Sequence, residues 1–161
     1  MTKVIRQNFI LFLDSNSETL SRICRVFASG SVEYEKNKNE IVRQLWRSFP
    51  LFINDTEKLN WIYRIGINTV LLYKSGKNKY HPPLFDNLFK LNNQEKLNQT
   101  HPRLIYTFID RLSIIDKTFT LLFLERRSAS EIAWITGISE KNAEWYISDI
   151  RGKIERILDN E

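Results

Sequence analysis

Apolar residues recur at helical spacing along most of the chain, and no stretch shows the sustained two-residue alternation of a β-strand bounded by hairpin turns. Four helices are predicted in the first half, over residues 4–13, 18–27, 35–49 and 57–74. Pro50 ends the third helix, and Asp55 or Thr56 is the expected N-cap of the fourth. Because the second half has the same periodicity, we predict an all-α protein of about seven or eight helices.

The same stripes predict which side chains form the core, because residues three and four apart share one face of a helix. In the second to fourth helices these are Leu20, Ile23, Cys24 and Phe27, then Ile41, Val42, Leu45, Trp46 and Phe49, then Leu59, Ile62, Ile65, Thr69 and Leu72. In the second half, a short helix runs through Ile105, Phe108 and Ile109, and the next through Ile115, Phe119, Leu122 and Phe123.

Residues 76–102 interrupt the periodicity. Gly76, Pro82, Pro83 and a cluster of Asn and Gln break any helix there. We therefore predict two small helical domains, residues 1–75 and 103–161, joined by a linker. Part of the linker is expected to lie in a groove on this protein or on a partner, because it is too apolar for a free tether at Leu84, Phe85, Leu88 and Phe89.

The segment from Ser128 to Ser139 has the spacing of a helix-turn-helix. Ser128 and Glu131 form an S-x-x-E capping box at the start of the support helix. Gly137 is suited to a left-handed turn, Ile138 is the expected plug between the helices, and Ser139 is the N-cap of the second helix.

The second helix of this motif is expected to bury a stripe formed by Ala143, Ile147, Ile150 and Ile154. The residues left for DNA or a partner are Lys141, Asn142, Glu144, Trp145, Ser148, Asp149 and Arg151, with Gly152 and Lys153 beside them. Acidic side chains oppose phosphate binding, and an exposed Trp145 suits a protein partner, although packing of Trp145 within the domain is the alternative.

Charge adds to this picture. The 161 residues hold 24 Lys and Arg against 19 Asp and Glu, a net charge of +5 that favours a nucleic-acid partner. The excess is uneven: residues 1–80 hold 13 against 7, residues 81–110 hold 3 against 3, and residues 111–161 hold 8 against 9. The basic character therefore belongs to the first half and not to the helix-turn-helix.

The sequence shows no residue pattern typical of an enzyme, a metal site or a cofactor site. The two histidines, His81 and His101, fall in the linker region, and no metal-ligand cluster, nucleophile triad or phosphate-binding loop is visible, so we expect no enzyme activity, metal or cofactor. Cys24, in an apolar stripe, is expected to be a buried structural thiol. We also expect a cytoplasmic protein with no membrane partner, because neither a bilayer-length apolar run nor a signal-peptide cleavage site occurs.

Two segments, in this order, resemble the extracytoplasmic-function (ECF) sigma factors of the sigma-70 family, and the resemblance runs from about Phe9 to Leu158. The first segment is EIVRQLWRSFPLF at 40–52 followed by KLNWIYRIGINTVLLY at 58–73, and it looks like sigma region 2, which binds the polymerase clamp and melts the minus-10 element. The second is DRLSIIDKTFTLLFLERRSASEIAWITGIS at 110–139, which looks like region 4.

The resemblance implies two further sites. Core RNA polymerase, through the clamp coiled coil of its largest subunit and through its flap, would be bound by Glu33, Glu40, Arg43, Gln44 and Arg47. Minus-10 promoter DNA would be held by Phe52, Asn54, Lys58, Trp61, Arg64, Asn68 and Lys74. Aromatic and amide groups suit a flipped base, and cations suit the displaced strand. Simple core packing is equally compatible with Trp46 and Trp61.

Departures from the family pattern concern charge. Where the family commonly has an acidic residue followed by Leu-x-Gln-Glu, this chain has KNKNE at 36–40. In region 4, family members usually carry Arg or Lys at the positions of Glu144, Tyr146 and Asp149. A lost base contact costs about 1 to 3 kcal/mol, so we expect weak autonomous reading of the minus-35 element.

The leading hypothesis is a diverged sigma factor whose first domain binds polymerase and opens DNA while its second docks on a protein. That protein would be an activator, an anti-sigma factor or a nuclease-inactive RNA-guided CRISPR effector, in which base pairing specifies the site. One alternative is an ordinary ECF sigma factor with an atypical minus-35 element. The other is a sigma-like adaptor that no longer initiates transcription.

Overall fold

The computed structural model describes residues 3–49, 58–74 and 109–159, and every regular element within these ranges is helical. The all-α prediction is confirmed for this part of the chain. The chain divides into two compact units, residues 1–78 and 79–161, and each is described by itself. The predicted linker at 76–102 lies outside the described residues, as do Ile105 and Phe108 of the short helix predicted after it.

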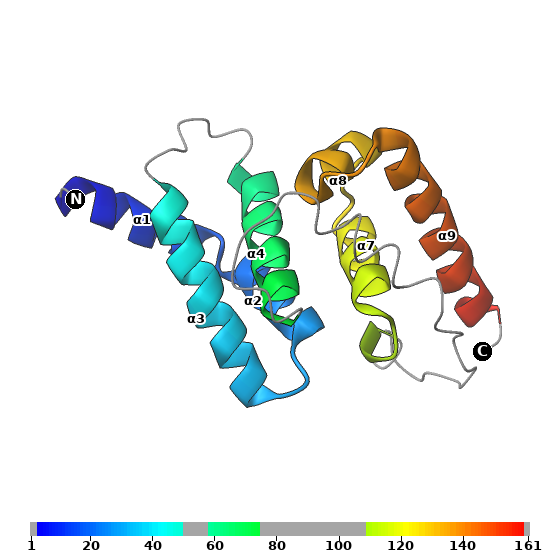
Figure 1. Ribbon diagram of the computed structural model, residues 1–161, viewed down its shortest axis with the longest axis horizontal. Coiled ribbons are helices and arrows are strands. Elements are labelled where there is room, and N and C mark those ends of the chain that lie inside the picture. The colour runs from blue at the N-terminus through cyan, green and yellow to red at the C-terminus, as the bar shows by residue number, and fades with distance from the viewer. Residues whose placement is uncertain (1–2, 50–57, 75–108, 160–161) are drawn as a thin grey trace. The chain divides into compact units, whose positions relative to one another are not determined.

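The first unit contains α1 (Lys3–Ser15), α2 (Ser17–Phe27), α3 (Ser31–Ser48) and α4 (Lys58–Lys74) (Figure 1). α4 packs against both α2 and α3. Gly66 permits this close approach, since a Cβ there would lie 3.1 Å from Cδ1 of Ile23 and 3.7 Å from Cγ2 of Ile41, both fully buried. α2 and α3 also pack against each other, so the three helices enclose one core.

The buried surface of α4 is wider than the predicted stripe. Ile62 and Thr69 are buried as expected, but Leu59, Ile65 and Leu72 are only half-buried. The other buried residues are Trp61, Tyr63, Gly66, Ile67, Val70 and Leu71. A helix that packs between two others buries more than one stripe, and this is why a single amphipathic face was the wrong prediction here.

The core of α2 is as predicted, with Leu20, Ile23, Cys24 and Phe27 all buried. Cys24 is a free thiol, and burial raises its pKa to about 11. The prediction of a buried structural thiol is confirmed.

α3 begins one turn earlier than predicted, at Ser31 instead of Glu35. The carboxylate of Glu33 accepts hydrogen bonds from the backbone N–H of Ser29 at 2.7 Å and from its hydroxyl at 2.6 Å. These bonds satisfy groups that precede the helix and so support the earlier start. Of the expected core stripe only Ile41 and Leu45 are fully buried, and Val42, Trp46 and Phe49 are half-buried.

An aromatic cluster ties α1 to the end of α3 and the start of α4. Neighbouring ring centroids lie 4.9 to 6.5 Å apart, within the range of favourable aromatic pairs, among Phe9, Phe12, Trp46, Phe49 and Trp61. Trp46 lies against Phe9, and Trp61 against Phe12 and Phe49. The packing interpretation of both tryptophans is confirmed.

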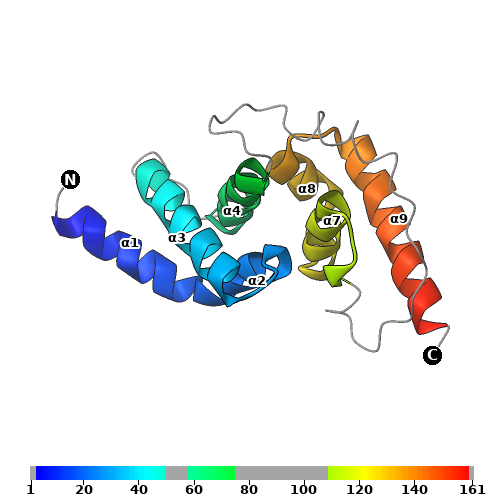
Figure 2. The ribbon, with the colours of Figure 1, turned by 60° about the horizontal axis from the view of Figure 1, so that its bottom comes forward.

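The second unit contains α7 (Ile114–Leu124), α8 (Ala129–Thr136) and α9 (Glu140–Leu158) (Figure 2). α9 packs against both α7 and α8. Ser113 caps α7, because its hydroxyl accepts a hydrogen bond from the N–H of Asp116 at 3.1 Å. Ile115, Phe119 and Leu122 of α7 are buried as predicted, whereas Phe123 is half-buried.

The turn after α7 has the hydrogen bonds of a Schellman motif. The N–H of Arg127 donates to the carbonyl of Leu122 and the N–H of Arg126 to that of Phe123, both at 3.0 Å. Arg126 adopts the left-handed conformation that the motif requires, with φ of 55°. Glycine usually occupies this position, so the turn carries a conformational cost at Arg126.

Candidate nucleic-acid and protein interfaces

The frame of the helix-turn-helix is built as the sequence predicts. The hydroxyl of Ser128 accepts a hydrogen bond from the N–H of Glu131 at 3.2 Å, and the Glu131 carboxylate accepts one from the N–H of Ser128 at 2.8 Å. Gly137 takes the left-handed conformation at φ of 79° and ends α8. Ser139 caps α9 by accepting from the N–H of Asn142. Local hydrogen bonds therefore fix where α8 begins and where α9 begins.

The buried side of α9 differs from the predicted stripe. Ala143, Tyr146 and Ile150 are buried, whereas Ile147 and Ile154 are only half-buried. The ring of Tyr146 stacks on Phe119 of α7, with centroids 3.8 Å apart and planes at 2°. The side of α9 that faces α7 is therefore the side that carries Tyr146. The Tyr146 position, where the family resemblance implies a DNA-contacting cation, belongs to the core of this unit.

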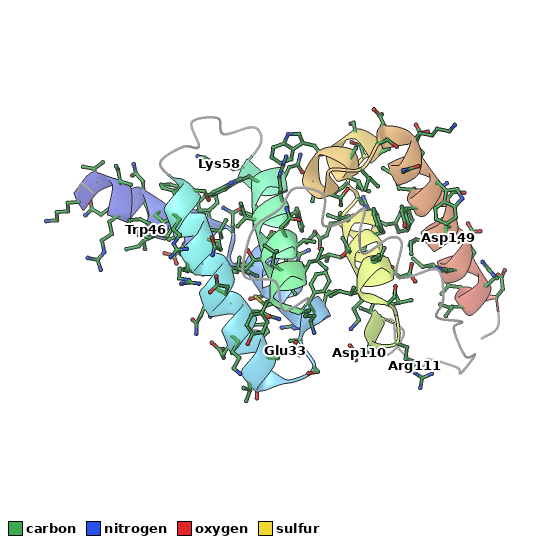
Figure 3. All side chains as sticks on the ribbon, in the orientation of Figure 1. Glu33, Trp46, Lys58, Asp110, Arg111 and Asp149 are labelled. Atoms are coloured by element: carbon green, nitrogen blue, oxygen red, sulfur yellow. The ribbon has the colours of Figure 1, made fainter. Side chains whose placement is uncertain are left out.

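Lys153 is surrounded by two carboxylates. Its ammonium group lies 2.8 Å from Asp149 on the same helix and 3.4 Å from Asp116 on α7. Burial acts to lower the pKa of Lys153, but the hydrogen bond to Asp149 and the charge of Asp116 outweigh burial and raise it. Asp149, labelled in Figure 3, is thus held in an ion pair within the unit. Neither Asp149 nor Lys153 offers a free charge to DNA.

The exposed face of α9 holds the remaining candidates. Trp145 has 59% of its surface exposed, and its ring meets Tyr146 edge-on at 5.0 Å. The prediction that Trp145 points outward is confirmed. Arg151 lies over the ring of Phe123, 5.9 Å from its centroid. The exposed set is Lys141, Asn142, Glu144, Trp145, Ser148 and Arg151.

Four of the five candidate polymerase contacts, Glu40, Arg43, Gln44 and Arg47, share one helical face of α3 with Lys36. This face is here called the α3 outer face. Arg43 donates to the Glu40 carboxylate at 2.7 Å, and the amide of Gln44 donates to the same carboxylate at 2.7 Å. Burial acts to raise the pKa of Glu40, but these two hydrogen bonds outweigh it and lower the pKa. The face keeps a net positive charge.

Glu33 and Lys74 were assigned to different surfaces, and the structure joins them. The ammonium of Lys74, at the end of α4, donates to the Glu33 carboxylate near the start of α3. This bond, together with the hydrogen bonds from Ser29, lowers the pKa of Glu33 to about 2. Figure 3 labels Glu33 and Trp46, which lie toward opposite ends of α3. The Glu33–Lys74 pair fastens α3 to α4.

The candidate minus-10 contacts are only partly brought together. Arg64 and Asn68 are half-buried one turn apart on α4, and Lys58 begins the helix. Trp61 is 5% exposed within the aromatic cluster, so its side chain faces the core and not the surface. Phe52 and Asn54 lie outside the described residues.

Asn37 has an environment that the sequence interpretation missed. It was grouped with the charged residues 36–40, yet it is 2% exposed in the core of α3. Its Nδ2 has no hydrogen-bond partner among the described residues. The signal was its spacing, since Asn37 precedes Ile41 and Leu45 by four and eight residues on one helical stripe.

Within the described ranges, no three His, Cys, Asp or Glu side chains are grouped so as to hold a metal ion, and no helix is long and apolar enough to cross a membrane. Comparison of the chain with protein-family models, with curated proteins and with solved structures gave no match.

Proposed function

We propose that this chain is a diverged sigma-type transcription initiation factor, made of a polymerase-binding and promoter-opening first domain and a helix-turn-helix second domain. The observation that carries the proposal is the complete helix-turn-helix of α8 and α9, with its capping box, its left-handed Gly137 and its Ser139 cap. This motif places a helix where it can meet the major groove or a partner bound to DNA.

The α3 outer face supports a role in polymerase binding. Its long polar side chains are exposed or half-buried, and Glu40 orients Arg43 and Gln44 through hydrogen bonds. Charged side chains held in a defined geometry favour a specific protein partner, because less side-chain freedom is lost on binding. The clamp coiled coil of the largest polymerase subunit is the partner that the resemblance implies.

The first domain is also the place for contact with melted DNA. Arg64 and Asn68 on α4 present a cation and an amide one turn apart, a pairing suited to a phosphate and an unpaired base. Lys74 is bonded to Glu33, so we no longer assign it to DNA. The buried Trp61 would support this surface from beneath.

The second domain meets its target with a nearly neutral face. Lys141 and Arg151 are balanced by Glu144 and Glu155, and Trp145 lies between them. Since phosphate binding scales with the number of cations, this face has little affinity for DNA alone. A protein partner, either an activator or an RNA-guided effector, would then provide the sequence-specific recognition of the DNA site. The resemblance also allows an anti-sigma factor here.

An ordinary sigma factor with an atypical minus-35 element is the second candidate, and a specific observation favours it. Of the three positions where the family carries cations, Tyr146 is internal and Asp149 is neutralised by Lys153. Only Glu144 therefore opposes DNA directly. Asn142, Lys141 and Arg151 remain available to read bases and phosphates.

The first test uses the full chain and bacterial core RNA polymerase. Reversing two charges of the α3 outer face, Arg43→Glu with Arg47→Glu, should weaken polymerase binding at least about tenfold, since each lost contact at a protein interface commonly costs about 1 kcal/mol or more. Arg25→Glu, an exposed site on α2, is the matched control and should have no effect. Unchanged binding by the double variant would remove α3 from the proposal.

Run-off transcription then separates an initiation factor from an adaptor. A sigma factor bound to core polymerase should produce transcript from a premelted template, whereas an adaptor binds and produces none.

Selection from randomised duplex DNA, with polymerase present, decides the role of α9. An enriched motif that disappears in Lys141→Ala and Arg151→Ala would establish direct reading, and the absence of a motif would support a protein partner.

A further inference from the structure

The exposed face of α9 is complementary to itself, and we propose that it binds α9 of a second copy of this chain in an antiparallel, two-fold symmetric contact. Ser148 lies at the centre of this face and is exposed. The charged and aromatic side chains are arranged around it so that a half-turn about an axis near Ser148 places unlike groups opposite one another to within one residue. This inference rests on α9 alone and does not depend on polymerase binding.

The charges reverse sign across Ser148. Lys141 precedes it by seven residues and Glu155 follows it by seven, while Glu144 precedes it by four and Arg151 follows it by three. All four side chains are exposed. In an antiparallel pair, Lys141 of one copy meets Glu155 of the other, and Glu144 meets Arg151. Two-fold symmetry makes each of these pairings twice.

The same operation brings a projecting ring to within one residue of a glycine on the partner helix. Trp145 is 59% exposed on this face, and Gly152 follows it by two helical turns. The antiparallel arrangement lays the indole of each copy over Gly152 of the other, which has no side chain of its own and is flanked by the guanidinium of Arg156. A buried tryptophan that fills a pocket is the commonest kind of dominant contact in protein interfaces.

Gly152 needs such an explanation, because packing within the chain does not require it. A Cβ at this position would meet nothing nearer than Nη2 of Arg156 at 3.9 Å. Glycine within a helix costs about 1 kcal/mol relative to alanine. The left-handed conformation that explains Gly137 does not apply here, since Gly152 lies in the middle of α9. A second molecule that approaches the backbone at Gly152 accounts for the residue.

DNA is a poorer occupant of this face than a second copy. The exposed charges of α9 are three cations and three acids, with Arg156 and Glu140 included, so they cancel, and a phosphate backbone would repel Glu144 and Glu155. A second copy can pair with both the cations and the acids, because an antiparallel α9 presents the same charges in reverse order. The contact also covers the surface that a promoter or a protein partner would use, so self-association and those interactions exclude each other.

The test is sedimentation velocity on the full chain, from about 1 μM to about 1 mM, the range in which a small interface is expected to dissociate. The 19.2 kDa monomer should convert reversibly to a dimer with rising concentration. Gly152→Gln should weaken the dimer at least tenfold while the fold stays intact, because within the chain an added Cβ would meet only the flexible end of Arg156, at 3.9 Å. Trp145→Ala should have a similar effect.

Two controls define the contact. Trp134→Ala removes an exposed tryptophan from α8, 38% exposed, and should leave dimerisation unchanged. Lys141→Glu should weaken the dimer, and adding Glu155→Lys should restore it by exchanging the two charges. A chain that stays monomeric at the highest concentration overturns the proposal. So does a dimer that tolerates Gly152→Gln, or a double charge variant as weak as the single one.

Discussion

The α3 outer face and the exposed face of α9 use their charged side chains differently. On α3, Glu40 holds Arg43 and Gln44 in place, and the exposed Lys36 and Arg47 keep the face positive. On α9, by contrast, Asp149 and Lys153 are bound to each other and, through Asp116, to α7. What remains exposed on α9 is neutral and includes the side chain of Trp145.

The comparison teaches that the charge a helix face offers to a partner excludes the side chains that form ion pairs within the fold. Counted from the sequence, α9 has an acid at 149 that repels DNA and a cation at 153 that attracts it. In the structure the two cancel inside the unit. The same holds for Glu33 and Lys74 in the first unit, where a presumed partner contact is an interhelical bond.

Tyr146 and Trp145 give the largest expected contrast between an internal and an external side chain. Tyr146→Ala should lower the free energy of unfolding by about 3 to 5 kcal/mol, because it removes the stacking on Phe119 and leaves a cavity. Trp145→Ala should lower it by no more than about 1 kcal/mol, since only the edge contact with Tyr146 is lost. Urea unfolding followed by circular dichroism measures both. Similar losses for the two variants would contradict the orientation of α9.

Lys153 tests whether the charges of α9 are internal. Lys153→Met should destabilise the chain by about 2 kcal/mol, because the nearly buried carboxylate of Asp116 loses its cation. Lys141→Met, at an exposed site without an ion pair among the described residues, is the matched control and should change the unfolding free energy by less than about 0.5 kcal/mol.

The same variant predicts a pH dependence. The pKa of Lys153 is raised in the folded state above its ordinary value of 10.5, so its stabilising effect is complete below that pH and is lost as the pH rises through the folded-state value. The difference in stability between the natural chain and Lys153→Met should therefore shrink in alkaline solution. A difference that stays constant would show that Lys153 acts by packing alone.

Glu33 is expected to have a smaller effect at the opposite end of the pH scale. Its pKa falls from 4.5 to about 2 on folding, so the carboxylate stabilises the first unit above pH 4.5 and that contribution disappears as the pH falls through 2. Glu33→Gln should remove about 1 kcal/mol at neutral pH, a value reduced by solvent screening. Acid titrations of unfolding, with Glu35→Gln as an exposed control, should show flatter pH dependence only for Glu33→Gln.

Arg126 should give the smallest change, and in the stabilising direction. Arg126→Gly relieves a left-handed conformation at φ of 55° and should raise the unfolding free energy by about 0.5 to 1 kcal/mol. Glu125→Gly, at an ordinary φ of −79°, should instead be destabilising because it only adds freedom to the unfolded chain. Equal signs for the two variants, measured as shifts in Tm, would reject the Schellman assignment.

Local features of the fold were predictable from the sequence because they depend on residues a few positions apart. The capping box of Ser128 and Glu131, the left-handed Gly137 and the Ser139 cap each close a hydrogen-bonded ring within one turn. The core of α2 was predictable for a similar reason, since one amphipathic stripe met one packed surface. These elements also define where the candidate interface of α9 begins.

The side chains of the candidate interfaces were harder to assign from the sequence. Which side of α9 is buried depends on the contact between Tyr146 and Phe119 of α7, two residues that are 27 positions apart in the chain. A small rotation of α9 about its own axis buries Tyr146 and leaves Ile147 and Ile154 half-buried, although the helical spacing of the apolar residues is unchanged. Asn37 is a different case, because its spacing from Ile41 and Leu45 places it on the buried stripe of α3 although its amide is polar.

The sequence by itself determined that the chain is helical in its described parts and that it ends in a helix-turn-helix, because helical period and caps are local properties. It also determined the self-complementary order of charges around Ser148, which is a property of the residue order in one helix. Only the tertiary structure decided which charges remain outside. Ion pairs such as Lys153 with Asp116 and Lys74 with Glu33 join residues distant in sequence, and their formation depends on how whole helices pack.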